Sequence, residues 1–254
     1  MSKVWDFYHY MDEIAPFEKQ ESWDNSGFLV GYGEREVKKV LLALDATKDV
    51  LAEAEKIGAE LIITHHPVIF GSLKEFHPQS MAFAAAEKGI AIISSHTALD
   101  IADGGVNDCL AAALGLQDVQ KGIDEMGLLR IGTLEKALPL ADFLSVVSEK
   151  LDVGGIKYTP TDRMIQKVAV CGGSGAEFYP DAMKAGADAF VTANVKHNFW
   201  IDIRRDGFCV LDAGHFCTEN TVIGPLSEKL AARFKDTEIL ISKVSADPAE
   251  YWAK

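Results

Sequence analysis

Short apolar runs alternate with amphipathic helical patterns along most of this 254-residue chain. In the first half, apolar runs with the length of buried strands occupy residues 40–44, 61–64 and 90–93. Helical patterns follow each of these runs, over residues 48–57, 81–88 and 106–114. Strand, helix, strand at this spacing predicts parallel βαβ units.

The second half repeats the alternation after an edge-type strand expected at residues 127–134. We expect one helix over residues 140–151 and another within 220–234, where Pro225 marks a boundary or a kink. Further short strands are expected at residues 154–158, 167–171, 189–192, 208–211 and 238–242. Because residues 117–126 are polar and aperiodic, we predict two layered α/β domains that meet near them: residues 1–122 with 220–254, and residues 123–219.

The charge balance disfavours one class of partner. With 25 basic and 38 acidic residues the net charge is −13, and this field repels the phosphates of nucleic acids. No apolar run approaches the roughly 20 residues that span a bilayer, and the N-terminal residues lack a signal-peptide core. The four cysteines form no CxxC pair, which is typical of reduced thiols. We therefore expect a cytoplasmic protein that is not bound to membranes.

Two adjacent histidines follow the apolar run at residues 61–64. Neighbouring side chains on a strand point to opposite faces, so His65 and His66 converge only where the strand ends and the chain turns. Pro67 favours such a turn by keeping His66 out of the helical region. The pair would lie at the carboxyl end of a parallel strand, where open α/β sheets bind ligands. Two histidines that are merely hydrogen-bonded in a loop are the alternative interpretation.

Two other strand ends carry side chains of the same kinds. His96 and Asp100 follow the run at residues 90–93, and each could also serve as a cap of the next helix. His215 and Glu219 follow the run at residues 208–211, and their four-residue spacing places both on one face of a helix. Cys217, between them, would point away and is expected to be structural.

Three or four imidazoles and two carboxylates exceed what one tetrahedral zinc ion needs. A pair of divalent ions would use this set, and such pairs generate a hydroxide nucleophile at neutral pH. Ligation by nitrogen and oxygen without thiolate suits zinc, manganese, iron or magnesium, so the identity of the metal stays open.

Three further features have more than one interpretation. The glycine-rich segment at residues 172–175 favours a tight turn over an anion-binding loop, since it lacks the spacing of phosphate- and dinucleotide-binding motifs. Lys196 and His197 form another polar pair after a strand. Asp45, at the end of residues 40–44, is a further candidate for the same rim.

Five segments of the chain, in this order, resemble the NIF-three-like dinuclear-metal family, often labelled GTP cyclohydrolase I type 2. They are WDNSG (23–27), THHPVIF (64–70), SHTALD (95–100) with GGVND (104–108), CGGSG (171–175), and DAGH (212–215) with TE (218–219). The resemblance is to the short form of the family, without an inserted module, and it covers about residues 23 to 219.

This resemblance implies a ligand set and an assembly. Two metal ions would be held by His65, His66, Asp100, His215 and Glu219. His96 would be a near-site histidine, outside the ligand set or acting as a proton carrier. The family implies two α/β domains with the metal site in the cleft between them, assembled into a toroidal homohexamer.

One segment departs from the family pattern of Thr-Gly-Asp/Glu followed by a terminal Tyr-His. Here Ala193, Asn194 and Asn198 replace the glycine, the acidic residue and the final histidine. We expect this difference to affect substrate contacts rather than the metal ligands.

The resemblance and the residues together favour a metal-dependent hydrolase that acts on a nucleotide or related small molecule, with GTP ring opening as the named candidate. The first alternative is a non-catalytic hexameric scaffold that binds metal for structure, regulation or transfer. A nucleotide-binding protein that uses the turn at residues 172–175 is the second alternative.

Overall fold

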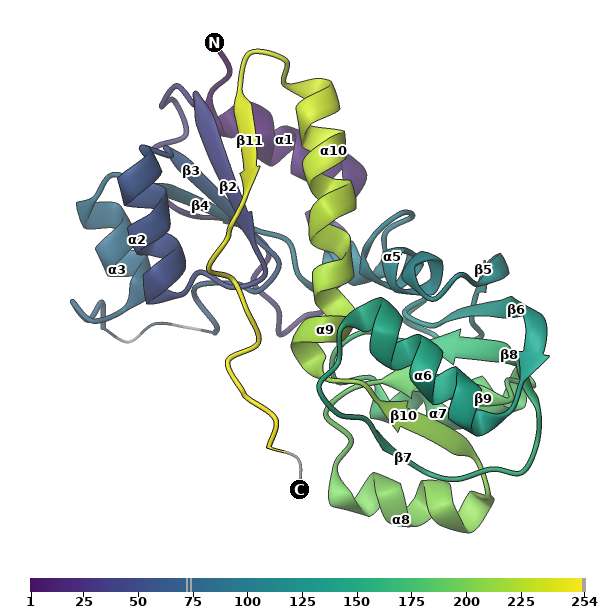
Figure 1. Ribbon diagram of the computed structural model, residues 1–254. Helices are drawn as coiled ribbons and strands as arrows, with labels where there is room; N and C mark the ends of the chain where they lie inside the picture. The colour runs from purple at the N-terminus through teal and green to yellow at the C-terminus, as the bar shows by residue number, and fades with distance from the viewer. Residues whose placement is uncertain (72, 74, 253–254) are drawn as a thin grey trace. The chain divides into compact units, whose positions relative to one another are not determined.

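The computed structural model describes residues 1–71, 73 and 75–252 (Figure 1). The chain forms two compact units, and each is described by itself: Met1–Asp103 with Ile223–Ala246, and Gly104–Val222 with Asp247–Lys254. Each unit has its own β-sheet with helices packed on it, so the predicted α/β fold class is confirmed. The domain boundaries expected after residues 122 and 219 stay a prediction. Within the described residues, no helix is both long enough and apolar enough to cross a bilayer.

The first unit contains a five-stranded sheet in the order β1-β4-β3-β2-β11. These strands are β1 (Gly27–Val30), β2 (Lys39–Ala43), β3 (Leu61–Thr64), β4 (Ala91–Ser94) and β11 (Glu238–Ile241). Strands β11, β2, β3 and β4 are parallel, and β1 pairs with β4 in the antiparallel direction. The parallel βαβ units predicted for this half are therefore present.

Helices pack on both faces of this sheet (Figure 1). They are α1 (Val4–Ile14), α2 (Lys48–Ile57), α3 (Met81–Glu87), α4 (Thr97–Ile101), α10 (Ile223–Arg233) and the short 3-10 helix η1 (Phe17–Lys19). Helix α2 begins where the Thr47 side chain accepts a hydrogen bond from the Val50 amide, and it ends at Gly58 in the left-handed conformation. Pro225 lies in the first turn of α10, where the helix tolerates proline.

The second unit contains a six-stranded sheet in the order β5-β6-β8-β9-β10-β7. Its strands are β5 (Gln117–Lys121), β6 (Arg130–Leu138), β7 (Lys157–Tyr158), β8 (Ile165–Val170), β9 (Ala189–Thr192) and β10 (Cys209–Asp212). Strands β8, β9 and β10 are parallel, whereas β6 is antiparallel to both of its neighbours.

Two expectations about this sheet were wrong. The strand expected at residues 127–134 as an edge strand is β6, and it lies between β5 and β8. The edge strand on this side of the sheet is β5, within residues 117–126, for which we expected no regular structure. Most of the β5 side chains are exposed, so they are polar on both faces and show no apolar alternation.

Two apolar cores lie on opposite faces of the second sheet, because successive side chains of a strand alternate between faces. Val168 and Val170 of β8 pack in one core with the helices α5 (Val106–Ala113) and α6 (Leu140–Leu151). Ala169 packs in the other core with the helices α7 (Tyr179–Lys184) and α8 (His197–Asp206). The remaining helices of this unit are α9 (His215–Glu219), η2 (Ala176–Phe178) and η3 (Asn220–Val222).

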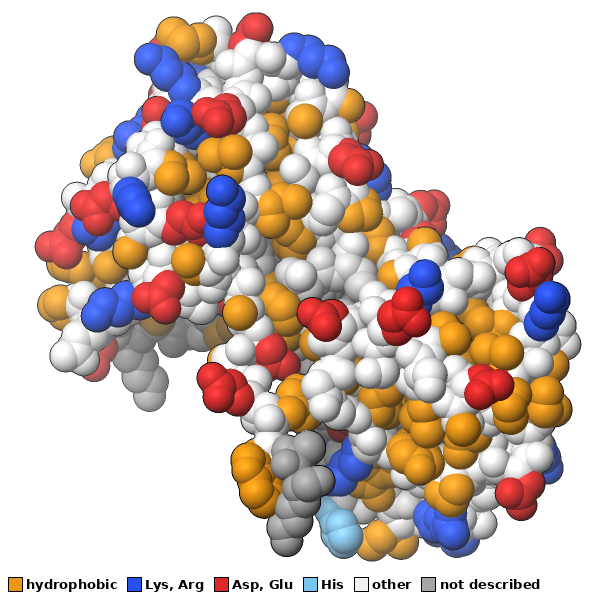
Figure 2. All heavy atoms as spheres, in the orientation of Figure 1, with side chains coloured by type: hydrophobic (Ala, Val, Ile, Leu, Met, Phe, Trp, Pro, Cys, Tyr) orange, Lys and Arg blue, Asp and Glu red, His pale blue; other side chains and the backbone are white. Residues whose placement is uncertain are grey.

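Charged side chains of both signs are spread over the face of the protein that Figure 2 shows. On the face seen in Figure 2, Lys and Arg side chains are scattered among Asp and Glu rather than gathered in one patch. Proteins that bind the phosphate backbone concentrate basic residues on one face or along one helix.

Candidate metal centre

The predicted ligands of the first unit follow strands that end in register. Ala43, Thr64 and Ser94 are the last residues of β2, β3 and β4, and they pair side by side across the sheet. The residues that come directly after these ends include Asp45, His65, His66 and His96. The sheet edge expected from the sequence is therefore formed.

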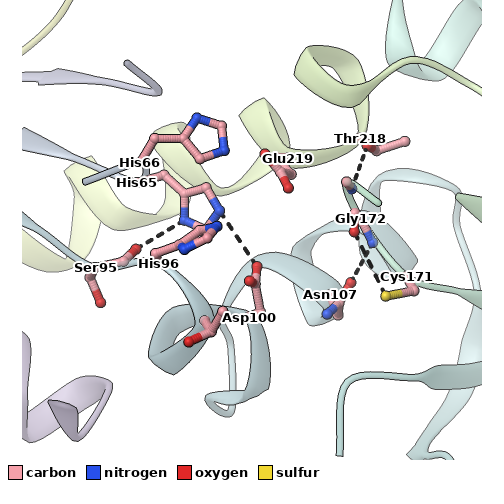
Figure 3. A network of polar contacts seen from close by, with 12 residues as sticks. His65, His66, Ser95, His96, Asp100, Asn107, Cys171, Gly172, Thr218 and Glu219 are labelled. Carbon is pink, nitrogen blue, oxygen red and sulfur yellow. Dashed lines mark hydrogen bonds and ion pairs between the residues drawn. The ribbon is translucent and has the colours of Figure 1, made fainter. Parts of the chain in front are cut away.

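His65 is buried, with 1% of its surface exposed. Its Nδ1 atom lies 2.9 Å from the carbonyl oxygen of Ser95. Because a carbonyl oxygen only accepts hydrogen bonds, Nδ1 carries the proton and the lone pair lies on Nε2. That Nε2 atom is 3.6 Å from Oδ1 of Asp100, which lies on α4 (Figure 3). His65 thus directs a ligand nitrogen toward a carboxylate.

His66 is oriented by Asp45. The Nδ1 atom of His66 lies 2.8 Å from Oδ1 of Asp45, and a carboxylate in this position places the proton on Nδ1 and the lone pair on Nε2. The turn is fixed by two further hydrogen bonds: the Thr64 hydroxyl donates to the His66 carbonyl, and the His66 amide donates to the Leu44 carbonyl. Asp45 therefore lies on the expected rim.

His96 is hydrogen-bonded to a buried carboxylate. Its Nδ1 atom lies 2.9 Å from Oδ1 of Asp24, whose side chain has no exposed surface. Burial raises the pKa of Asp24, but hydrogen bonds from His96 and Thr97 outweigh it and hold that pKa well below its usual range. Asp24 is therefore ionised, and it orients the His96 ring through Nδ1. Its sequence signal was the WDNSG segment, which did not reveal this role.

Three histidines of the first unit, His65, His66 and His96, converge. Ring centroids are 4.9 Å apart for His65 and His66, 5.1 Å for His65 and His96, and 5.4 Å for His66 and His96. One ring nitrogen from each lies within 4.8 Å of the others, so the group could hold a metal ion. Together with Asp100, they form a set of nitrogen and oxygen donors without thiolate, which suits first-row divalent ions.

The predicted ligands of the second unit lie on one short helix. His215 begins α9 and Glu219 ends it, and their Nε2 and Oε2 atoms are 3.0 Å apart. The four-residue spacing thus places both side chains on one face, as expected. The Nδ1 atom of His215 lies 2.9 Å from the Nδ2 atom of Asn194, a residue in the left-handed conformation. The segment that differs from the family pattern therefore contacts a predicted metal ligand. We did not expect this contact from the sequence.

The glycine-rich segment after β8 is a tight turn whose amides have side-chain acceptors. Gly172 donates to Asn107 Oδ1 and Gly173 donates to Thr218 Oγ1, at 2.7 and 3.1 Å (Figure 3). Gly173 has a φ of +61°, and a Cβ there would lie 2.0 Å from Oε1 of Glu219. These contacts favour the turn over an anion-binding loop, and they explain the glycine that borders Glu219.

Two other candidates lie apart from these groups. Lys196 and His197 are exposed at the start of α8, and neither belongs to a cluster of possible metal ligands among the described residues. The Sγ atom of Cys217 lies 3.9 Å from the Asp152 carbonyl oxygen, and burial, helped by Asp247 and Asp152, raises its thiol pKa. Both observations agree with a structural role for Cys217.

The fold and these side chains define a class of protein: an α/β protein with histidines and carboxylates at the ends of its strands. The family model of Duf34/NIF3 (NGG1p interacting factor 3) matches residues 2–248, and the chain belongs to this family.

Named relatives and solved structures agree with this assignment. The "GTP cyclohydrolase 1 type 2 homolog" of Clostridium perfringens is 34% identical over 260 residues, which cover 98% of this chain and 99% of that protein. The protein of the same name from Lactococcus lactis is 31% identical and covers 97% of this chain and 98% of its own. A Staphylococcus aureus hypothetical protein has a TM-score of 0.91 at 28% identity, covering 98% of this chain and 99% of that one.

Proposed function

We propose that this chain is a dinuclear metal-dependent hydrolase acting on a nucleotide or a related small molecule. The convergence of His65, His66 and His96 carries the proposal, because each of these rings has an oxygen atom at Nδ1 that directs Nε2 outward. The names of the relatives support GTP ring opening as the candidate reaction.

The proposed ligands are His65, His66 and Asp100 of the first unit with His215 and Glu219 of the second. The donor set fits two divalent ions, since it offers three imidazole nitrogens and two carboxylates. Zinc, manganese, iron and magnesium all remain candidates. When bound, such ions supply Lewis acidity and lower the pKa of a coordinated water molecule.

The chain itself would supply proton transfer and orientation. His96 would donate a proton to the leaving group, while ionised Asp24 fixes the ring through Nδ1. Glu219 would be a ligand that the two ions share. We further propose a cytoplasmic toroidal homohexamer, for which light scattering of the purified protein gives a direct mass.

Purified protein loaded with Zn²⁺ or Mn²⁺ should turn over at least one member of a panel of nucleotides and phosphoesters. The double variant His65→Ala/His66→Ala should lose this turnover, because two proposed ligands are removed. His197→Ala is the matched control, since His197 is an exposed histidine at the start of α8. Absence of turnover across the panel, or equal turnover in the double variant, rejects the hydrolase and leaves the metal-binding scaffold.

Asn194→Asp should tighten metal binding by about 10-fold, measured by competition with a chelating dye. The amide nitrogen of Asn194 faces Nδ1 of His215. The amide must therefore rotate before its oxygen can accept a hydrogen bond from Nδ1–H. A carboxylate only accepts, so it would leave the Nε2 lone pair for the metal without that rotation. Asn198→Asp, on the exposed start of α8, is the control. Unchanged affinity in Asn194→Asp would show that Asn194 does not orient His215.

A further inference from the structure

Two exposed aromatic side chains stand against His96 in the first unit. Trp23 is 57% exposed and Phe70 is 54% exposed. Their ring centroids lie 5.7 and 5.6 Å from that of His96, and both rings meet the imidazole at steep angles of 73° and 77°. Trp23 and Phe70, which we call the aromatic clamp, thus both contact the His96 ring in edge-to-face geometry.

The backbone beneath the clamp is held in place by buried polar contacts. Asp24, next to Trp23, accepts hydrogen bonds from the backbone amide and the hydroxyl of Thr97, at 3.0 and 2.6 Å. The Asn25 side chain donates to the carbonyl oxygen of Ile69, the residue before Phe70, at 2.8 Å. The two aromatic residues are therefore presented by loops that are bonded to each other and to α4. Such pre-organisation lowers the entropy cost of binding a ligand.

We propose that the aromatic clamp binds the planar heteroaromatic ring of the substrate by stacking. Exposed indole and phenyl faces are costly in water, and flat π-systems such as nucleobases cover them favourably. Recognition of an uncharged ring also avoids the repulsion that the net charge of −13 imposes on phosphates. The placement of the ring beside the reaction centre rests on the proposed function, whereas ring binding itself does not.

Tryptophan fluorescence of the full chain, stripped of metal with EDTA and titrated with guanosine, tests the clamp. Stacking on Trp23 should quench part of the emission, and ribose 5-phosphate, which has no ring system, should not. The guanosine-dependent quench should vanish in Trp23→Leu. In Phe70→Leu, guanosine should bind about 5- to 100-fold more weakly, the range for loss of one stacking side chain.

Tyr32→Leu is the matched control, because Tyr32 is an aromatic residue of the same unit with 78% exposure and lies outside the clamp. A quench that persists in Trp23→Leu, or that weakens equally in Tyr32→Leu, overturns the proposal. A quench that depends on protein concentration and not on guanosine would assign the clamp to contact with a second copy and would also overturn it. Because metal is absent, failure of the hydrolase leaves this result intact. Failure of the clamp leaves turnover of ring-free phosphoesters unaffected.

Discussion

Asp108→Ala should lower the free energy of unfolding by about 3–5 kcal/mol, measured by urea denaturation followed by circular dichroism. Arg130 on β6 is 1% exposed, and its Nε atom donates to Oδ1 of Asp108 on α5. The substitution removes the Asp108 carboxylate from the guanidinium, which keeps its carbonyl acceptor at Gly127. Removing one acidic partner from a buried arginine costs far more than a surface ion pair contributes.

Asp142→Ala is the matched control for this measurement. Asp108 and Asp142 are both acidic residues in the first turn of a helix of the second unit, so both interact favourably with a helix dipole. Only Asp108 also faces a buried arginine. The control should lose at most about 1 kcal/mol. An Asp108→Ala variant as stable as the control would mean that Arg130 does not need this carboxylate.

Much of the fold could be predicted because its strands are buried on both faces. Strand β3, helix α2 and helix α6 have the predicted bounds, since buried parallel strands read as apolar runs and helices as periodic ones. Helix α1 was not predicted, although Val4, Phe7 and Met11 are buried at helical spacing. Strand β5 carried no signal, because a polar edge strand resembles a loop.

The sequence predicted the candidate ligands of the site but not the residues that hydrogen-bond to them. Position after a strand end was enough to select His65, His66 and His96, because parallel strands end at one edge. Their hydrogen-bond partners were not predictable in the same way. His96 meets Asp24 across 72 positions of sequence, and His65 meets a backbone carbonyl, which leaves no trace in residue type. Such contacts depend on the register and the loop path of the folded chain.

Glu219→Gln should keep the fold but reduce bound metal from two equivalents per chain to one. Elemental analysis of the dialysed protein measures the equivalents, and thermal unfolding reports on the fold. Glutamine has the shape of glutamate, so it fits beside Gly173, where there is no room for a Cβ. It also keeps an oxygen atom beside Nε2 of His215, which lies 3.0 Å from the Glu219 carboxylate.

What the substitution removes is the negative charge and one ligand oxygen, and a bridging carboxylate needs both. Glu177→Gln is the control, because Glu177 is an exposed glutamate of the same unit and has no proposed part in ligation. The control should retain two equivalents. Two equivalents in Glu219→Gln would refute the bridging role. A fall to zero equivalents would mean that both ions need the charge of Glu219. It would contradict our expectation that the ligands of the first unit keep one ion without it.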